Sequence, residues 1–204
     1  YVYSLALDNT GKLWSWGYNV YGQLGNNSIL QQATPVAVSA AWGASTITAI
    51  AAGYYHSLAL DNTGKLWSWG WDGTGQLGDN AAKVNQPTPV PVATLTGIIA
   101  VAGGRYHSLA LDNTGKVWSW GLNQFGQLGD GSFANRNTPV QVAGLSKRPT
   151  VTTGEATSKT QSTAILNGTV NANGALTTVW FDYGTSSGFY TGTTTAQSIS
   201  GTTT

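Results

Sequence analysis

Residues 56–70 read HSLALDNTGKLWSWG, and nearly the same fifteen residues occur three times in this chain. The first copy, YSLALDNTGKLWSWG, occupies residues 3–17, and the third, HSLALDNTGKVWSWG, occupies residues 107–121. The copies start at residues 3, 56 and 107, so their spacings are 53 and 51 residues. A long period within one chain indicates a tandem repeat, in which each copy forms one structural unit.

Each copy continues with further shared segments. GQLG follows at residues 22–25, 75–78 and 126–129, and Thr-Pro-Val closes each unit at residues 34–36, 88–90 and 138–140. Short apolar stretches at residues 47–53 and 98–103 precede the second and third copies. The unit is therefore about 50 residues long, the size of one four-stranded propeller blade.

The pattern within the unit predicts antiparallel strands. SLALD is short, apolar and bounded by turn residues, and the DNTG after it places Asp and Gly at the first and fourth positions of a type I turn. The two Trp residues of WSWG share one face of the returning strand. Thr-Pro-Val begins an edge strand, where proline removes no ladder hydrogen bond. Because both faces of SLALD are apolar or small, we expect each sheet to lie between two neighbours, as in a β-propeller.

The residues around the repeated histidines resemble a known family. IAAGYYHSLAL at residues 50–60 and VAGGRYHSLAL at residues 101–111, with the downstream WSWG and GQLG, are similar to the RCC1 (regulator of chromosome condensation) repeat, here expected to be of bacterial type. Tyr3 stands where the first copy would have its histidine. The resemblance covers residues 1–145 and implies a ring of about seven blades.

We therefore predict an all-β chain that contains a partial RCC1-like propeller of about three blades, with repeats near residues 1–46, 47–97 and 98–145. Two blade faces rich in Trp and Leu would stay open, and large apolar patches rarely remain in water. The chain is accordingly expected to be part of a longer protein, to receive blades from elsewhere, or to self-assemble through the open faces.

The repeat stops after Leu145. Residues 146–150, with a Lys-Arg-Pro, are expected to form a linker. Residues 162–170 (STAILNGTV) and 177–183 (TTVWFDY) predict strands, separated by a turn at 171–174 (NANG). Residues 151–204 resemble the opening of a fibronectin-type-III-like module, a β-sandwich of about 100 residues. We expect this module to be truncated and to end in a Thr-rich stretch.

Composition excludes several kinds of function. Charged residues make up 8% of the chain and the formal net charge is +1, so no nucleic-acid partner is expected. Cysteine is absent, which excludes disulfides, a thiolate nucleophile and a Cys-ligated zinc. No run of eighteen apolar residues occurs, so no transmembrane segment is expected. The absence of both Cys and Met suits an extracellular location.

Residues that could carry chemistry recur at one place in each repeat, as scaffold residues do. His56 and His107 are the only histidines, and we expect each to hydrogen-bond a backbone group of the next blade. Asp8, Asp61 and Asp112 are expected to accept backbone N–H groups at their turns. We therefore expect no catalytic residue, no metal site and no cofactor. The repeated Trp residues are expected to lie mainly in the core: Trp14, Trp16, Trp67, Trp69, Trp118 and Trp120.

The loops after WSWG differ between the copies, so we expect partner specificity to lie there. Tyr and Trp are frequent in protein contacts, although these aromatic residues could instead cover the blade edge. Trp42 and Trp71 lie outside the repeated Trp positions and are the better candidates for exposure. One acidic residue, Asp130, is too few for a calcium loop. The candidate binding-loop residues are Tyr18, Tyr21, Trp71, Asp72, Leu122 and Phe125.

These observations predict a non-enzymatic extracellular or cell-surface protein that acts as a scaffold and binds a protein or cell-surface partner. Two other functions stay open. The family resemblance implies guanine-nucleotide exchange or chromatin association, which would need acidic loops facing a GTPase, and no acidic loop stands out. The third option is inhibition of a secreted enzyme through the loop aromatic residues.

Overall fold

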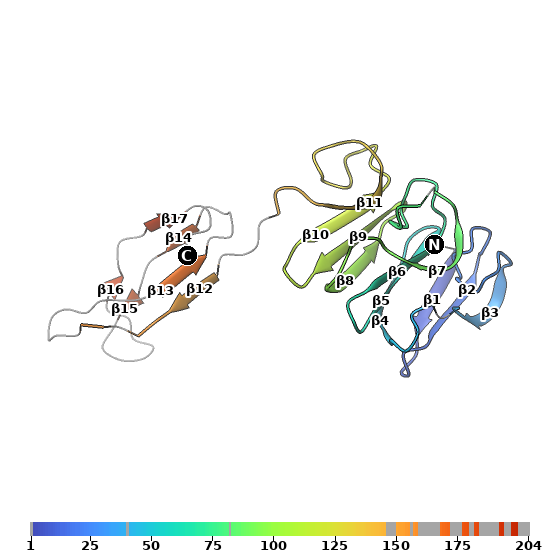
Figure 1. Ribbon diagram of the computed structural model, residues 1–204, viewed down its shortest axis with the longest axis horizontal. Coiled ribbons are helices and arrows are strands. Elements are labelled where there is room, and N and C mark those ends of the chain that lie inside the picture. Colours follow the sequence, from blue (N-terminus) through green and yellow to red (C-terminus); the bar gives the residue numbers. More distant parts are fainter. Residues whose placement is uncertain are drawn as a thin grey trace. The chain divides into compact units, whose positions relative to one another are not determined.

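The computed structural model describes residues 2–39, 41–81, 83–145, 150–155 and 157–158, together with short strands between residues 168 and 199. The chain forms two compact units, Tyr1–Leu145 and Ser146–Thr204 (Figure 1). All regular elements in the described part of the chain are strands. None of its segments is a helix long and apolar enough to cross a membrane.

The Tyr1–Leu145 unit consists of three antiparallel sheets that follow one another along the chain (Figure 1). The first sheet contains β1 (Tyr3–Leu7), β2 (Leu13–Gly17) and β3 (Gln32–Ala37) in that order. The second contains β4 (Ile47–Ala52), β5 (His56–Asp61), β6 (Leu66–Gly70) and β7 (Gln86–Pro91). The third contains β8 (Ile98–Gly103), β9 (His107–Asp112), β10 (Val117–Gly121) and β11 (Arg136–Gln141). We call these sheets blades 1, 2 and 3; they confirm the predicted strands of the repeat.

The DNTG turn closes the central hairpin of each blade. In blade 2, Gly64 N donates to Asp61 O at 3.0 Å, as the predicted turn requires. Asp61 Oδ1 accepts from Thr63 N at 2.9 Å, and Asp61 Oδ2 accepts from Trp67 Nε1 at 3.1 Å. Burial raises the pKa of the Asp61 carboxyl, but the hydrogen bonds from Thr63 and Trp67 outweigh it, so the pKa is lowered. The repeated Asp therefore joins the turn to the first Trp of WSWG.

Blade 2 lies between its two neighbours, because both of its faces are buried. Every residue of β5 and β6 is buried. Its leucine face packs with Trp120 of blade 3, whereas its Trp67 and Trp69 face packs with Leu13 of blade 1. The prediction that each sheet needs apolar groups on both faces is confirmed here. This stacking of antiparallel sheets is the arrangement of successive blades in a β-propeller.

The Ser146–Thr204 unit is described only at its strands. They form three antiparallel pairs: β12 (Thr150–Thr153) with β13 (Gly168–Asn171), β14 (Thr177–Val179) with β17 (Gln197–Ile199), and β15 (Asp182–Tyr183) with β16 (Gly192–Thr193). The predicted strand 162–170 is described from Gly168 onward, and the rest of it lies outside the described residues. The same holds for most of the predicted turn 171–174 and of the linker 146–150. The fibronectin-like sandwich stays a prediction.

Candidate binding surface

GQLG joins each blade to the next, which explains why it recurs. Gln23 O of blade 1 accepts hydrogen bonds from Trp69 Nε1 at 2.9 Å and from Ser57 Oγ at 2.8 Å, both in blade 2. Gln76 O of blade 2 does the same for Trp120 Nε1 at 2.9 Å and Ser108 Oγ at 2.8 Å in blade 3. In blades 2 and 3, the second Trp of WSWG is thus buried and hydrogen-bonded to the preceding blade.

The six repeated Trp residues differ in burial. Trp67, Trp69 and Trp120 are buried. The other three are half-buried: Trp14, Trp16 and Trp118. Trp42, which the sequence favours as exposed, is also half-buried and meets the ring of Trp67 edge-on, with centroids 6.3 Å apart. It therefore belongs to the packing of blade 2 rather than to an open surface.

The histidines are placed for contact between blades. His56 is fully buried, and its Nε2 lies 2.9 Å from Ser108 Oγ of blade 3. Because Ser108 Oγ donates to Gln76 O, it accepts from His56 Nε2–H. The expected backbone partner is therefore wrong: the partner is a side-chain hydroxyl. Burial, with a smaller effect of His107, lowers the pKa of His56 to about 3, so the ring is neutral at physiological pH.

Tyr3 takes the place of a histidine in blade 1. Its hydroxyl donates to His56 O and lies 2.9 Å from Ser57 Oγ, whose own proton goes to Gln23 O. Tyr3 thus contacts Ser57 of blade 2, just as His56 contacts the equivalent Ser108 of blade 3. His107 holds the corresponding position in blade 3 and is half-buried.

Three of the predicted binding-loop residues gather with three tyrosines from other loops. Tyr55 is at the centre, with its ring centroid 4.9 Å from Tyr21, 6.0 Å from Tyr18 and 6.5 Å from Trp71. Tyr54 lies 4.3 Å from Tyr55. Tyr106 completes the group, 5.2 Å from Trp71. All six are half-buried, and we call them the aromatic surface: Tyr18, Tyr21, Tyr54, Tyr55, Trp71 and Tyr106.

The pairing of strands explains how these loops meet. His56 pairs with Gly70 across β5 and β6, so the residues just outside that pair, Tyr55 and Trp71, are neighbours. Trp71 N donates to Tyr55 O at 2.9 Å. Leu122 N donates to Tyr106 O at 2.8 Å at the same position of blade 3. Sequence reasoning missed the three tyrosines, although the register of the predicted hairpin would have placed them beside the WSWG loops.

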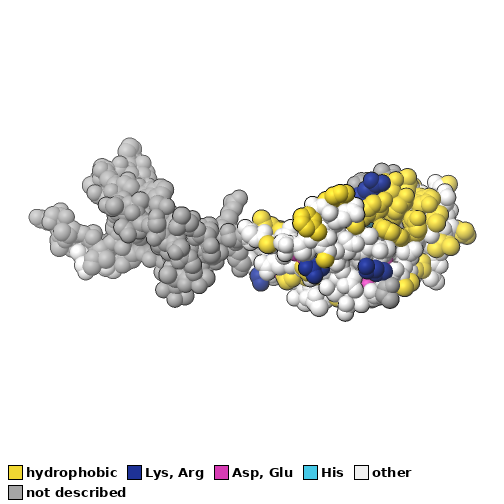
Figure 2. Space-filling view, turned by 90° about the horizontal axis from the view of Figure 1, so that it is seen from above, with side chains coloured by type: hydrophobic (Ala, Val, Ile, Leu, Met, Phe, Trp, Pro, Cys, Tyr) yellow, Lys and Arg dark blue, Asp and Glu magenta, His cyan; other side chains and the backbone are white. Residues whose placement is uncertain are grey.

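A basic side chain lies against the aromatic surface. Arg105 is exposed, and its guanidinium carbon is 5.0 Å from the ring centroids of both Tyr54 and Tyr106. A guanidinium at this distance from ring faces is attracted by their quadrupoles. Burial and the neighbouring Tyr54 raise the pKa of Tyr55, so its hydroxyl stays neutral. Figure 2 shows hydrophobic side chains gathered on one face of this unit, with basic side chains beside them.

The other predicted loop residues are not members of this group. Phe125 is 79% exposed and Leu122 is half-buried. Asp72 is fully buried, so it presents no side chain to a partner and is not a binding residue of this surface. Its Oδ1 accepts from Leu77 N at 2.9 Å inside its own blade.

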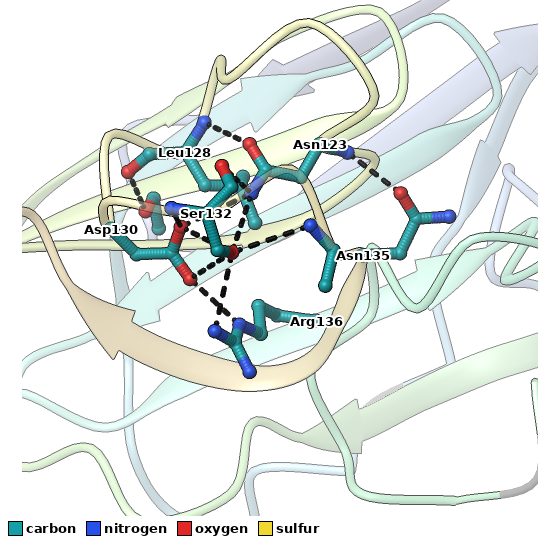
Figure 3. Close-up of polar contacts among 8 residues, drawn as sticks. Asn123, Leu128, Asp130, Ser132, Asn135 and Arg136 are labelled. Atoms are coloured by element: carbon teal, nitrogen blue, oxygen red, sulfur yellow. Dashed lines mark hydrogen bonds and ion pairs between the residues drawn. The ribbon is translucent and has the colours of Figure 1, made fainter.

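Polar contacts within the third loop hold it together (Figure 3). Asn123 Nδ2 donates to Asp130 Oδ1 at 3.1 Å and to Ser132 O at 3.0 Å. Arg136 Nε donates to Asp130 Oδ2 at 2.7 Å. The Asp130 carboxylate is therefore satisfied by donors from its own loop and from the start of β11. No group of three or more His, Cys, Asp or Glu side chains suited to a metal occurs in the part of the chain that the structure describes.

Comparison with protein families agrees with this geometry. The model of the regulator of chromosome condensation (RCC1) repeat matches residues 10–60, 63–111 and 114–156. The chain belongs to the RCC1 repeat family. A second model of the RCC1 repeat matches residues 47–76 and 98–127. The first two ranges each begin in the hairpin turn of one blade and end in the next blade, so the RCC1 sequence repeat is out of phase with the sheets.

Relatives with RCC1 repeats include two plant proteins. The mitochondrial RCC1 domain-containing protein RUG3 of Arabidopsis thaliana is 39% identical over 143 residues, 69% of this chain and 32% of that protein. The ultraviolet-B receptor UVR8 of Arabidopsis thaliana is 31% identical over 141 residues, again 69% and 32%. The chain thus spans about a third of the length of these curated relatives.

Solved structures share the RCC1 fold. Yeast RCC1 (Prp20), in its complex with Kap60, matches with a TM-score of 0.64 and 28% identity, over 69% of this chain and 35% of that one. Human WBSCR16 matches with a TM-score of 0.65 over 76% of this chain and 40% of that one. Its identity is 21%, so this likeness concerns the fold alone.

Proposed function

We propose that this chain is a non-catalytic protein-binding module whose partner contacts the aromatic surface. The observation that carries this is the gathering of five tyrosines and Trp71, all half-buried, with Arg105 exposed beside them. Tyr, Trp and Arg are the residues that contribute most to binding energy at protein interfaces. Tyr18, Tyr21 and Trp71 lie on loops that differ between the blades, so this part of the surface can be specific while the scaffold is shared.

Relatives support a protein as the partner. The yeast structure that matches this chain is RCC1 (Prp20) bound to Kap60, and a second yeast structure concerns the binding of Prp20p to Gsp1p and histones. The net charge of +1 offers little electrostatic attraction for nucleic acid. A protein that packs against the aromatic rings is therefore a better match for this surface than a highly charged nucleic acid.

The non-catalytic part of the proposal rests on the roles of the reactive side chains. His56 is neutral and hydrogen-bonded between blades. Asp61 is held by its own turn. Ser108 has its proton directed at a backbone oxygen, which leaves it no free hydroxyl for nucleophilic attack.

We further propose an extracellular or cell-surface location in a bacterium. The low charge, the absence of Cys and Met and the Thr-rich end support it, as does the fibronectin-like resemblance of residues 151–204. Immunodetection of the full-length protein in fractionated cells tests the location, and detection in cytosol alone would overturn it.

Quantitative capture from culture medium and surface extract tests the binding proposal. The full chain is immobilised as wild type, Trp71→Ala and Phe133→Ala, and captured proteins are quantified by mass spectrometry. Phe133 is an exposed aromatic residue outside the aromatic surface. We expect the specific partner to bind Trp71→Ala about tenfold or more weakly and Phe133→Ala unchanged. Equal capture by all three folded proteins would contradict the proposal.

A further inference from the structure

The residue two places after WSWG differs in one blade only. Blades 1 and 3 have Asn19 and Asn123, whereas blade 2 has Asp72. All three are fully buried. Their Oδ1 atoms play one role, because each accepts the backbone N–H of the GQLG leucine, at 2.8, 2.9 and 2.9 Å in blades 1, 2 and 3. The three side chains therefore have the same orientation.

The second side-chain atom distinguishes the blades. Asn19 Nδ2 donates to Ser28 O at 2.8 Å and to Leu30 O at 3.0 Å, which ties the following loop to the blade. Asn123 Nδ2 donates to Ser132 O and Asp130 Oδ1 in the same way (Figure 3). Asp72 has Oδ2 at this place, and this buried oxygen has no hydrogen-bond partner in the described part of the chain.

The loop that follows Asp72 keeps the acceptor arrangement of its sister loops. Ala81 N donates to Asp79 Oδ1 at 2.9 Å, as Ser132 N donates to Asp130 Oδ1 at 3.0 Å in blade 3. Repeat equivalence thus places Asp79 and the carbonyl of Ala81 around Asp72 Oδ2. These groups accept hydrogen bonds, and an ionised carboxylate has no proton to give them.

The charged partners of the carboxylates also differ between blades 2 and 3. Arg136 donates to Asp130 at 2.7 Å, but the residue at the matching start of β7 is Gln86. The charged groups that act on Asp72 are Asp79 and Lys83, and Lys83 is exposed. A buried carboxylate without a donor is costly, whereas a neutral carboxyl offers an O–H where the sister blades offer an amide N–H.

We propose that a proton on Asp72 holds the blade 2 loop, residues 79–81 and 83–85, in the conformation that an asparagine amide holds in blades 1 and 3. Protonated Asp72 donates through Oδ2 to an acceptor of the loop. Loss of the proton removes that bond and leaves a buried negative charge among acceptors, so the loop loosens. Because Trp71 precedes Asp72 and belongs to the aromatic surface, the device lies directly beside that surface but does not depend on its ligand.

The expected pH range follows from the environment of the carboxyl. Burial raises the pKa of Asp72 to about 6, with Asp79 raising it further and the Leu77 hydrogen bond and Lys83 opposing. The folded pKa exceeds the ordinary value of 3.8, so the stabilisation is complete below about pH 4 and is lost as pH rises through about 6. The buried His56, whose pKa is lowered, changes stability in the opposite direction, so variants of residue 72 are needed to separate the two.

Hydrogen exchange of the loop amides tests the proposal on the full chain. Wild type and Asp72→Asn are compared at pH 5 and pH 7.5, with rates corrected for intrinsic exchange. We expect wild-type protection of residues 79–81 and 83–85 to fall roughly tenfold or more between these pH values. Asp72→Asn should keep its protection at both, because it restores the amide donor of the sister blades. A similar fall in Asp72→Asn, or none in wild type, would overturn the proposal.

Two further variants test whether the proton on the carboxyl is itself responsible. Asn19→Asp should transfer the pH dependence to the loop of residues 26–31, because it recreates the Asp72 arrangement in blade 1. Asp79→Asn should lower the midpoint pH of the blade 2 loop, because it removes a neighbouring negative charge. Protection that is retained at pH 7.5 only on addition of Na⁺ or Ca²⁺ would overturn the proposal in favour of a bound cation.

Discussion

At the scale of single residues, close approach between blades decides which side chains are allowed. A Cβ on Gly25 would lie 2.6 Å from Trp69 Nε1, and one on Gly78 would lie 2.6 Å from Trp120 Nε1. Both glycines also have a positive φ, +68° and +67°. The last glycine of GQLG is therefore required twice, once for its backbone and once for the Trp of the next blade.

Gly25→Ala should lower the free energy of unfolding by about 2–4 kcal/mol, from backbone strain together with overpacking against Trp69. Gly144→Ala is the matched control, because Gly144 has φ +73° and no atom within 4 Å of the added Cβ. Gly144→Ala should lower the free energy of unfolding by about 1 kcal/mol, from backbone conformation alone. Urea unfolding at equilibrium measures both. Equal losses would show that Trp69 does not restrict this position.

At the scale of elements, blades are joined through one serine position as well as through apolar packing. Ser108 of β9 accepts from His56 of β5 and donates to Gln76 O. Ser57 of β5 donates to Gln23 O in the same way. Ser4, at this position of β1, is half-buried, and its hydroxyl has no hydrogen-bond partner in the described residues. The same residue type thus has different energetic weight in different blades.

Ser108→Ala should destabilise the chain by about 1–3 kcal/mol, because it leaves the buried His56 Nε2–H and one bond to Gln76 O unsatisfied. Ser4→Ala should change stability by less than about 0.5 kcal/mol. Thermal unfolding followed by near-ultraviolet circular dichroism provides the comparison. If both variants lose the same stability, the serine position acts through strand propensity and not through contacts between blades.

At the scale of the whole molecule, the outer face of blade 3 is equivalent to the leucine face of blade 2, which blade 3 covers. Leu58, Leu60 and Leu66 of blade 2 pack against Trp120 of blade 3. Their equivalents in blade 3 line a shallow hollow of about 150 Å³ and are half-buried: Leu109, Leu111 and Val117. The Trp-bearing face of another blade is the complementary surface, as it is inside this chain.

We therefore predict that the full chain self-associates in a concentration-dependent way, with the Trp14 and Trp16 face of one copy on the leucine face of another. Leu111→Gln should weaken this association about tenfold or more, because it places an amide in an apolar contact. Ile29→Gln, which changes an exposed residue that does not line the hollow, should leave the association unchanged. Sedimentation velocity over a concentration series measures both; a wild type that stays monomeric throughout would contradict the prediction.

Sequence alone was enough to predict the repeat, the DNTG hairpins, the strands and, for blade 2, the burial of both faces. These features depend on local turn chemistry and on the pattern of side chains along single strands, and that pattern occurs three times in the chain. It also placed Tyr18, Tyr21 and Trp71 in variable loops. It did not predict the tyrosines beside them, because Tyr54, Tyr55 and Tyr106 sit in the family signature, where repetition indicates a scaffold role.

Which of these residues meet, and which are buried, depends on the packing of the blades. Tyr55 reaches Tyr21 because blades 1 and 2 pack against each other and bring their loops together. Asp72 looks like a loop residue in sequence, yet it is enclosed, and its missing donor becomes visible only beside Asn19 and Asn123. Whether a buried polar atom has a hydrogen-bond partner depends on its neighbours in three dimensions. The sequence shows that one repeat has Asp where the others have Asn, but it does not show that this change leaves a buried oxygen without a donor.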